Sequence, residues 1–429
     1  MPRGNRNGRS ERRREYSGRQ SDDESINDNA SVISNISEGK SAEDNEETDF
    51  LAQEQLEEKL LELIDGLTQK SSQGRTNCFQ SLTKAFIKKS MPAFIRERYF
   101  TICDGIERSL KKGGGPEKTA AAELATIMTV QLGGEDASEE IYKLLKSVLL
   151  TTICDNSAAP AVRAMCCTAL GQITFLAMAD VMDALVIMHQ LELIYSASYL
   201  KGDGSMPNVT AETGTLHAAA ISAWSLLFTL LSPGNIEKMI NNSKTLPSLE
   251  KLSELLKSLH LDVRMAAGEA LAIIFELGRE ESENFEEDFA VDVLATLKQL
   301  ATDSHKYRAK KDRKLQKASF RDILKFIESD TVPELQVRFE REMVLIGSWA
   351  KRKQYESLCN ILGPSINLHL AENEFLRDIF EIIDEPVSND LVTHFNFQMN
   401  RRTKRMVNTA NSKARTLSRA KNRDKRAIF

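Results

Sequence analysis

The sequence has little of what all-β and membrane proteins require. Its 429 residues include only 10 prolines and 21 glycines, and aromatic residues make up 6%. So few turn-forming residues argue against a β-sandwich or β-barrel of this size. No run of about 18 uncharged apolar residues appears, so we expect no membrane-spanning helix. Hydrophobic residues make up 41% of the chain, enough for a sizeable core built mostly from Leu, Ile, Ala and Met.

The signals of secretion and disulfide bonding are also missing. The first 20 residues carry seven arginines and lack the apolar centre of a secretory signal. The six cysteines do not form a Cys-x-x-Cys motif, the spacing that is typical of metal and redox sites. We therefore expect buried thiols in a reducing compartment, and a cytoplasmic or nuclear protein without membrane attachment.

Catalytic motifs are absent as well. The glycine-rich stretch 112–119 has Glu117 where a phosphate-binding loop needs glycine, and no apolar strand precedes it. The six histidines are scattered; His369 and Glu372 form an HxxE that is not the HExxH of zinc proteases. There is no Gly-x-Ser-x-Gly motif. We expect no enzymatic activity, no metal, no cofactor and no small-molecule substrate.

What the sequence does contain is charge arranged in blocks. The net charge of −5 is the sum of +5 over residues 1–20, −9 over 21–50, −11 over 51–400 and +10 over 401–429. Residues 1–50 are polar, acidic and rich in Ser, so their composition predicts disorder. We therefore divide the chain into a disordered segment (1–50), a helical domain (51–385) and a basic C-terminal helical region (386–429).

Helical periodicity begins near Gln53 and continues through the middle of the chain. Apolar residues at i, i+3 and i+4 predict helices that short connectors separate, and no convincing run of period-two alternation competes with these segments. The predicted segments include 78–87, 119–132, 141–153, 162–177, 181–200, 216–231, 263–277, 289–300, 315–327, 343–349 and 355–370. The fold class is therefore all-α.

A weak internal repeat runs through these helices. Basic residues at 75, 118 and 163 are 43 and 45 residues apart. Val-Arg occurs at 162–163 and 263–264, and in both places Ala-Leu follows, with the leucine seven residues after the arginine. Periods of about 40–47 residues are typical of HEAT and armadillo repeats, in which small residues let neighbouring helices approach. We expect such a solenoid, with room for a degenerate unit between 163 and 264; a non-repeating bundle is the alternative.

One predicted helix carries a candidate second basic ridge. Residues 305–325 hold nine Lys or Arg and two Asp. On a helix, Lys310, Lys314, Lys317, Arg321 and Lys325 share one face, while Leu315, Ile323, Leu324 and Ile327 lie on another. This arrangement predicts a helix that packs on the array and presents positive charge, either to phosphates or only to solvent.

The tail is the stronger candidate for binding nucleic acid. Residues 387–429 contain no Gly or Pro, so a long helix is permitted, and its apolar stripe is thin. It has no aromatic residue between 401 and 428, which favours phosphate contacts with structured RNA or DNA over base stacking. A nuclear-localisation signal or a solvated extension is the alternative. The candidate RNA-binding residues are Arg401, Arg402, Lys404, Arg405, Lys413, Arg415, Arg419, Lys421, Arg423, Lys425 and Arg426.

Several stretches together resemble the interferon-related developmental regulator family, over most of residues 51–429. They include Ser-Leu-Lys-Lys-Gly at 109–113, the segment 264–277, Ser-Phe-Arg-Asp-Ile-Leu at 319–324, Asn-Glu-Phe-Leu-Arg at 373–377, and the terminal 413–427. The resemblance implies an armadillo/HEAT-like body without enzymatic activity. It also implies that Lys413, Arg415, Arg419, Lys421, Arg423, Lys425 and Arg426 match the family's tail.

The resemblance implies two functions. The first is binding to translationally inactive ribosomes and their RNA through the C-terminal helix. The second is transcriptional co-regulation in the nucleus, with protein partners bound in the groove of the solenoid. The sequence leaves both open, and ribosomal RNA is the partner we expect.

Overall fold

The computed structural model describes residues 45–382, except 178, 242–245, 303–308 and 341. The predicted disordered segment (1–50) and basic region (386–429) therefore lie almost wholly outside the described residues. The chain divides into two units, 1–56 and 57–429. The first is described only from residue 45, in the N-terminal half of helix α1 (Asn45–Gly66). The following paragraphs concern the second unit.

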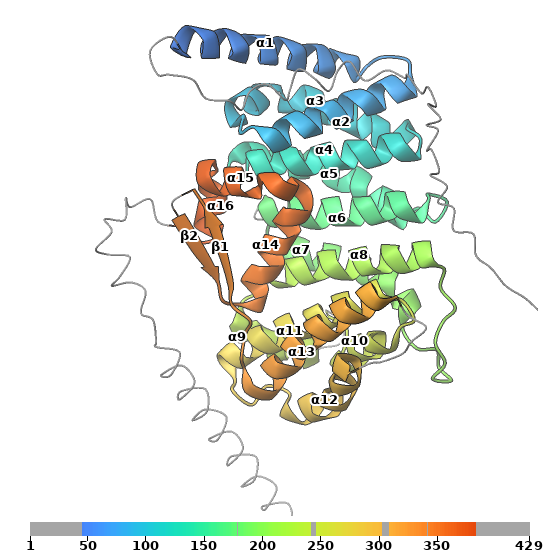
Figure 1. The fold of residues 1–429 in the computed structure, drawn as a ribbon. Helices are drawn as coiled ribbons and strands as arrows, with labels where there is room; N and C mark the ends of the chain where they lie inside the picture. Colours follow the sequence, from blue (N-terminus) through green and yellow to red (C-terminus); the bar gives the residue numbers. More distant parts are fainter. Residues whose placement is uncertain (1–44, 178, 242–245, 303–308, 341, 383–429) are drawn as a thin grey trace, which may run out of the picture. The chain divides into compact units, whose positions relative to one another are not determined.

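The second unit is a stack of antiparallel helix pairs, as the repeat predicted (Figure 1). A first row contains α2 (Ser72–Lys88), α4 (Gly115–Gln131), α6 (Pro160–Leu176), α8 (Ala211–Phe228), α11 (Leu261–Glu281) and α13 (Lys310–Ser329). Each helix of this row packs on the next. Beside them lie α3 (Pro92–Lys112), α5 (Asp136–Cys154), α7 (Val181–Tyr195), α9 (Pro233–Asn241), α10 (Leu249–Glu254) and α12 (Glu287–Thr302). The α7–α8 pair is the degenerate unit expected between 163 and 264.

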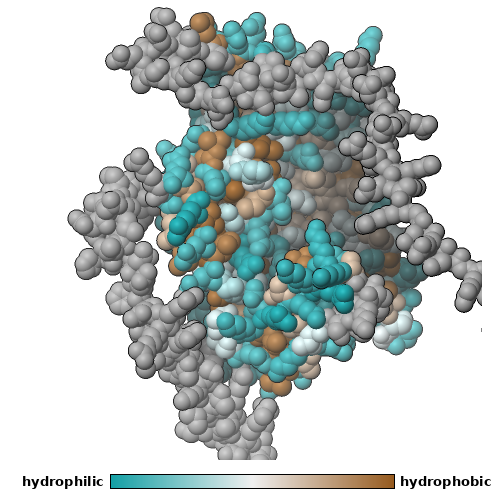
Figure 2. Space-filling model, viewed as in Figure 1, coloured by the Kyte–Doolittle hydropathy of each residue, from teal (hydrophilic) through white to brown (hydrophobic). Residues whose placement is uncertain are grey.

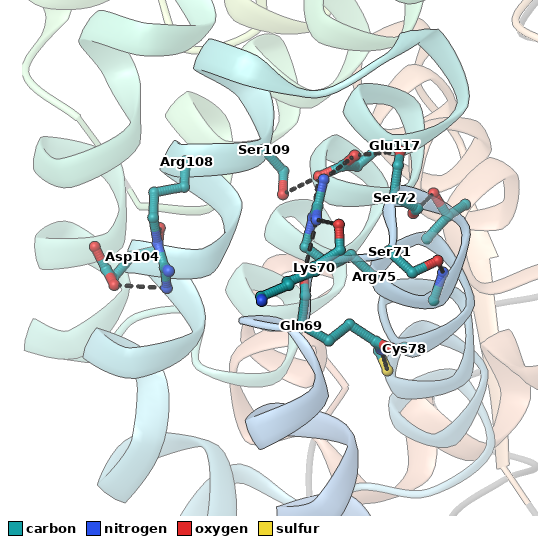
Figure 3. Close-up of polar contacts among 12 residues, drawn as sticks. Gln69, Lys70, Ser71, Ser72, Arg75, Cys78, Asp104, Arg108, Ser109 and Glu117 are labelled. Atoms are coloured by element: carbon teal, nitrogen blue, oxygen red, sulfur yellow. Dashed lines mark hydrogen bonds and ion pairs between the residues drawn. The ribbon is translucent and has the colours of Figure 1, made fainter.

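The repeated arginines have a common structural role. Arg75, at the start of α2, donates to the carbonyl oxygens of Gln69 and Lys70, 2.8 and 3.0 Å away (Figure 3). Arg264, at the start of α11, donates in the same way to the carbonyls of Ser258 and Leu259. The Arg163 guanidinium donates to one carbonyl, that of Ile153. These carbonyls lie at the end of the preceding segment, where carbonyl groups lack hydrogen-bond donors within a helix. Each of these three arginines thus joins its own helix to the segment that precedes it.

Small and branched residues fill the space between layers. Ala122, Ala169, Leu170, Ala267 and Leu271 are all fully buried, as the repeat predicted. Alanine at these positions lets the backbones of neighbouring helices approach, while leucine fills the remaining volume. The all-α solenoid is therefore confirmed for the described part of the second unit.

One predicted helix is wrong. Residues 343–349 were expected to be helical, but β1 (Leu335–Phe339) and β2 (Glu342–Ile346) form an antiparallel hairpin in which Val337 faces Val344. The hairpin turn lacks the Asn-Gly or Asp-Gly pair that usually predicts it. Instead, Glu340 adopts the left-handed conformation with φ of 47°. Because each strand has only five residues, the alternation was too short to be recognised.

The last three described helices cover part of the first row. They are α14 (Trp349–Leu362), α15 (Ile366–Glu372) and α16 (Glu374–Ile379), which we call the C-terminal module. The predicted helix 355–370 is interrupted by Gly363, whose φ of +53° and ψ of −131° suit only glycine. Figure 1 shows the module in front of the first row. There the Lys353 ammonium donates to Ser222 and Glu269, and Nε2 of His369 donates to the carbonyl oxygen of Ile87, 2.9 Å away.

Candidate nucleic-acid interface

The basic ridge lies on α13, as the periodicity predicted. Lys310, Lys314, Arg321 and Lys325 are exposed, and Lys317 is half-buried. Within the described residues none of these five has an ion-pair partner, so their charges face solvent. The ridge extends over 16 residues, or about 24 Å of helix. In Figure 2 the surface over α13 is largely hydrophilic.

The opposite face of α13 holds the helix in place. Phe320, Ile323 and Ile327 are buried against the rest of the stack. Gln316 accepts two hydrogen bonds from the Arg264 guanidinium, at 2.7 and 3.2 Å, and donates to the carbonyl of Leu300 in α12. The ridge is therefore presented by a rigid helix. Two expected packing residues behave differently: Leu324 is only half-buried, and Leu315 is 52% exposed.

The other end of α13 is also fixed. Asp330 follows the helix in the left-handed conformation, with φ of 48°, and binds Arg279 of α11. The second guanidinium nitrogen of Arg279 donates to the carbonyl of Ile327 at 3.1 Å. Arginine near a helix C-terminus satisfies carbonyl groups that lack partners within the helix. Gln316 and Asp330 thus tie α13 to α11 at two points, one within the ridge and one beyond its last lysine.

The tail residues predicted to bind RNA all lie outside the described residues. They are Arg401, Arg402, Lys404, Arg405, Lys413, Arg415, Arg419, Lys421, Arg423, Lys425 and Arg426. Their position relative to the ridge on α13 is therefore not described, and their role stays a prediction. The last described residue is Ile382, just after α16.

The groove expected to hold protein partners is partly covered by the chain itself. Beside α14 there remains a cavity of about 360 Å³, floored by α6, α8 and α11. Small residues such as Ala223 and Ala266 line its floor, Asp262 adds a carboxylate, and Leu315 and Asn360 belong to its walls. Figure 2 shows the hollow on this face. The sequence did not predict that the chain itself covers part of the groove, because no local pattern indicates where the C-terminal module packs.

One pair of side chains resembles a nucleophile beside a base. The Ser198 hydroxyl lies 2.6 Å from Nδ1 of His217, but both residues are buried. Burial and the nearby charges of His260 and Arg163 lower the pKa of His217 to about 4, which makes it a poor general base at neutral pH. The adjacent cavity, about 10 Å³, has room for one water at most. The pair is therefore a hydrogen bond within the core, without the features of a catalytic dyad.

Metal ligands, membrane spans and cysteine thiols are the remaining features of the described residues. Among them, no group of three His, Cys, Asp or Glu side chains is placed to hold a metal ion. Nor does any helix in this part of the chain have the length and apolarity to cross a bilayer. Cys78, Cys103, Cys166 and Cys167 are buried as expected, whereas Cys154 is exposed. Burial raises the pKa of the Cys103 thiol to about 12, so it is unreactive at neutral pH.

Comparison with known proteins accounts for nearly the whole chain. A family model described as "Interferon-related developmental regulator" matches residues 29–328, and one described as "Interferon-related protein conserved region" matches 373–427. Interferon-related developmental regulator 2 of Mus musculus is 38% identical over 375 residues, covering 87% of this chain and 84% of that protein. Interferon-related developmental regulator 1 of Sus scrofa is 39% identical over 376 residues, covering 87% and 82%.

A solved structure of an engineered protein gives a weaker match. It aligns with 63% of this chain and 97% of its own, at a TM-score of 0.39 and 15% identity. That likeness is too slight to inform either fold or function. The family models and the curated relatives agree with each other, and the resemblance seen in the sequence is confirmed. The chain belongs to the interferon-related developmental regulator family.

Proposed function

We propose that this family member is a non-enzymatic regulator that binds structured RNA of translationally inactive ribosomes through its basic tail. The observation that carries the proposal is charge. Residues 401–429 contain eleven Lys or Arg and one Asp, a net charge of +10, whereas residues 51–400 carry −11. RNA repels an acidic body, so the attraction must come from the tail.

The family match supports the tail as a functional unit. The conserved-region model spans residues 373–427 and so includes all eleven basic residues of the tail. A continuous helix over residues 401–429 has a length of about 44 Å, enough to follow a groove in a ribonucleoprotein. Its lack of aromatic side chains between 401 and 428 favours phosphate contacts over stacking on bases.

The ridge on α13 supplies a second positive surface. Because α13 is fixed to α11 by Arg264 and Arg279, its lysines are presented without the loss of backbone freedom that a loop incurs. We expect the ridge to add to RNA affinity and the tail to provide most of it. Each phosphate contact should contribute to the dependence of affinity on salt.

A second function has an observation of its own. The cavity of about 360 Å³ beside α14 is a concave, largely apolar surface that a protein partner could enter. A nuclear co-regulator of transcription that bridges proteins through this surface is the alternative. In that case the basic tail is a localisation signal, and its removal leaves partner binding unchanged.

The test is a salt titration of binding to purified 80S ribosomes. With six to eight phosphate contacts, log K should fall with log salt at a slope of roughly −4 to −7. Changing Arg415, Arg419, Arg423 and Arg426 to Gln should remove most binding and flatten the slope by about three. The matched control changes four exposed lysines outside both basic regions to Gln: Lys84, Lys88, Lys201 and Lys257.

The control separates specific contacts from general charge. It removes the same number of charges, so equal losses in both variants would mean that net charge alone attracts the ribosome. Unchanged affinity and slope in the tail variant would reject the tail as the RNA contact. The co-regulator would then be the better proposal. A third variant, with Lys310, Lys314, Lys317 and Arg321 changed to Gln, measures the contribution of the ridge.

A further inference from the structure

The hairpin leaves one strand edge open. Within the described residues the sheet has only two strands, and β1 packs beside α15. In Figure 1, β2 is the outer strand of the pair. An unpaired edge presents backbone N–H and C=O groups that another strand can bind, and proteins usually cover such edges. Two strands alone are also only marginally stable.

The exposed face of β2 is apolar as well as open. Val344 and Ile346 are buried against the body, but Met343 is 44% and Leu345 is 51% exposed. Solvent-facing positions of an edge strand normally carry charged or polar residues that oppose pairing. Here the outward side chains of β2 favour an additional strand.

The described chain ends close to this edge. Arg377 of α16 binds Glu342, the first residue of β2, at 2.9 and 3.2 Å. Only five residues later, at Ile382, the description stops. Glu381, in turn, pairs with Lys351, five residues after the end of β2. Residues 377–381 therefore contact both the start of β2 and the segment that follows it.

The sequence that follows has the pattern of a strand. After 383–390, which includes Pro386, Ser388, Asn389 and Asp390, comes Leu-Val-Thr-His-Phe-Asn-Phe-Gln-Met at 391–399. Leu391, Phe395, Phe397 and Met399 alternate with polar His394, Asn396 and Gln398, as on a half-buried strand. On a helix, Phe397 would point about 200° away from Phe395. This alternation differs from the long helix that the absence of Gly and Pro permits.

We propose that residues 391–399 form a third strand on the free edge of β2, with their apolar side chains beside Met343 and Leu345. The eight intervening residues can span up to about 28 Å, more than the roughly 17 Å length of β2, so the segment reaches either end of that strand. Main-chain hydrogen bonds to β2 supply the pairing, and the alternate side chains fix its register.

The strand has a consequence for the tail. It ends at Met399, and the basic run begins at Arg401. Pairing would therefore hold the start of the tail at the hairpin instead of leaving it on a free linker. This consequence rests on the proposed RNA-binding function; the pairing itself does not.

The experiment is amide hydrogen exchange on the full-length chain without RNA, followed residue by residue by NMR. We expect residues 391–399 and alternate amides of β2 to be protected together. Phe395→Pro should remove a strand hydrogen bond and speed exchange at both places by at least about tenfold. Thr409→Pro, beyond the segment, is the matched control and should leave both unchanged. The melting temperature of the body checks that neither variant unfolds it.

Three results would overturn the proposal. Exchange across 391–399 as fast as in an unfolded peptide would show that the edge is not covered by this segment. Helical chemical shifts over the same residues would favour the continuous helix. Protection of β2 that rises with protein concentration would assign the edge to a second copy. Because RNA is absent, failure here leaves the salt titration of ribosome binding intact as a separate test.

Discussion

Arg75 of α2 and Glu117 of α4, 42 residues apart, form a two-point ion pair between neighbouring layers (Figure 3). The two nitrogen–oxygen distances are 2.7 and 2.9 Å. Ser72 and Ser109 each donate a further hydrogen bond to the same carboxylate. Arg264 makes an equivalent bond to Gln316 of the next layer in the row. Arg75 and Arg264 therefore join successive layers of the stack in addition to binding the segment before their own helix.

Replacing Glu117 should be costly because the carboxylate is almost fully buried. Glu117→Gln should lower the free energy of unfolding by about 2–4 kcal/mol, since it leaves the Arg75 charge without its partner. The control is Glu107→Gln, which breaks an exposed pair with Lys111 and should cost less than about 1 kcal/mol. Denaturant unfolding measures both. Similar losses in the two variants would contradict a special role for the buried pair.

The same carboxylate should give a specific dependence on pH. Burial alone raises the pKa of Glu117, but hydrogen bonds from Arg75, Ser72 and Ser109 outweigh it, so the pKa lies below its ordinary value. A lowered pKa in the folded state means that the pair stabilises fully above the ordinary value of about 4.3 and loses this contribution as pH falls through the folded pKa. Unfolding measured from pH 6 to pH 3 should show this loss in the wild type and a smaller one in Glu117→Gln.

Gly268 should tolerate no side chain. A Cβ there would lie 2.8 Å from the Phe320 ring and 3.0 Å from Ile323, both in α13. Gly268→Leu should overpack this seam and lower the free energy of unfolding by about 1–3 kcal/mol, with a smaller effect for Gly268→Ala. At Gly202 a Cβ would meet nothing within 4 Å, so Gly202→Ala is the matched control. A Gly268→Leu protein as stable as the wild type would show that α13 can move away from α11.

The C-terminal module should depend on Glu276. Its carboxylate accepts hydrogen bonds from the Trp349 and Ala350 amides, at 2.7 and 2.8 Å, and so caps the N-terminus of α14. Glu276→Ala should destabilise the module by about 1–2 kcal/mol and speed amide exchange in α14 more than in α4. Glu280→Ala, at an exposed residue one turn further along the same helix, is the control. Equal exchange in α14 and α4 would mean that the module does not open by itself.

A residue that favours the left-handed conformation at position 340 should stabilise the hairpin turn. Glu340 has φ of 47°, a backbone conformation that is strained for residues other than Gly, Asn and Asp. Glu340→Gly should raise the free energy of unfolding by up to about 1 kcal/mol through relief of that strain. Glu340→Ala removes the same charge but keeps the strain, so it should give no gain. If Ala stabilises as much as Gly, charge and not backbone conformation is the cause.

The sequence by itself determined the helices of the first row, their order and the ridge, whereas α3 was not predicted and residues 343–349 were wrongly expected to be helical. Periodicity is a local property, and it correctly placed Ala122, Ala169 and Leu271 on buried faces and Lys314 and Arg321 on an exposed one. The spacing of the basic residues at 75, 118 and 163, and the second Val-Arg at 263–264, likewise indicated a stack of repeats. Arg75, Arg163 and Arg264 each donate to a carbonyl of the segment before their own helix.

Only the tertiary structure decided what covers each face. In the sequence, Glu117 indicated only that residues 112–119 do not form a phosphate-binding loop. Its ion-pair partner, Arg75, lies 42 residues away in the chain. Likewise His369 reaches the carbonyl of Ile87 across 282 residues, and this contact places the C-terminal module on the first row. Leu315 was expected to pack but lines the remaining groove. A periodic pattern states which face of a helix is apolar, whereas the choice of partner depends on side-chain fit and hydrogen bonds between segments that are distant in the chain.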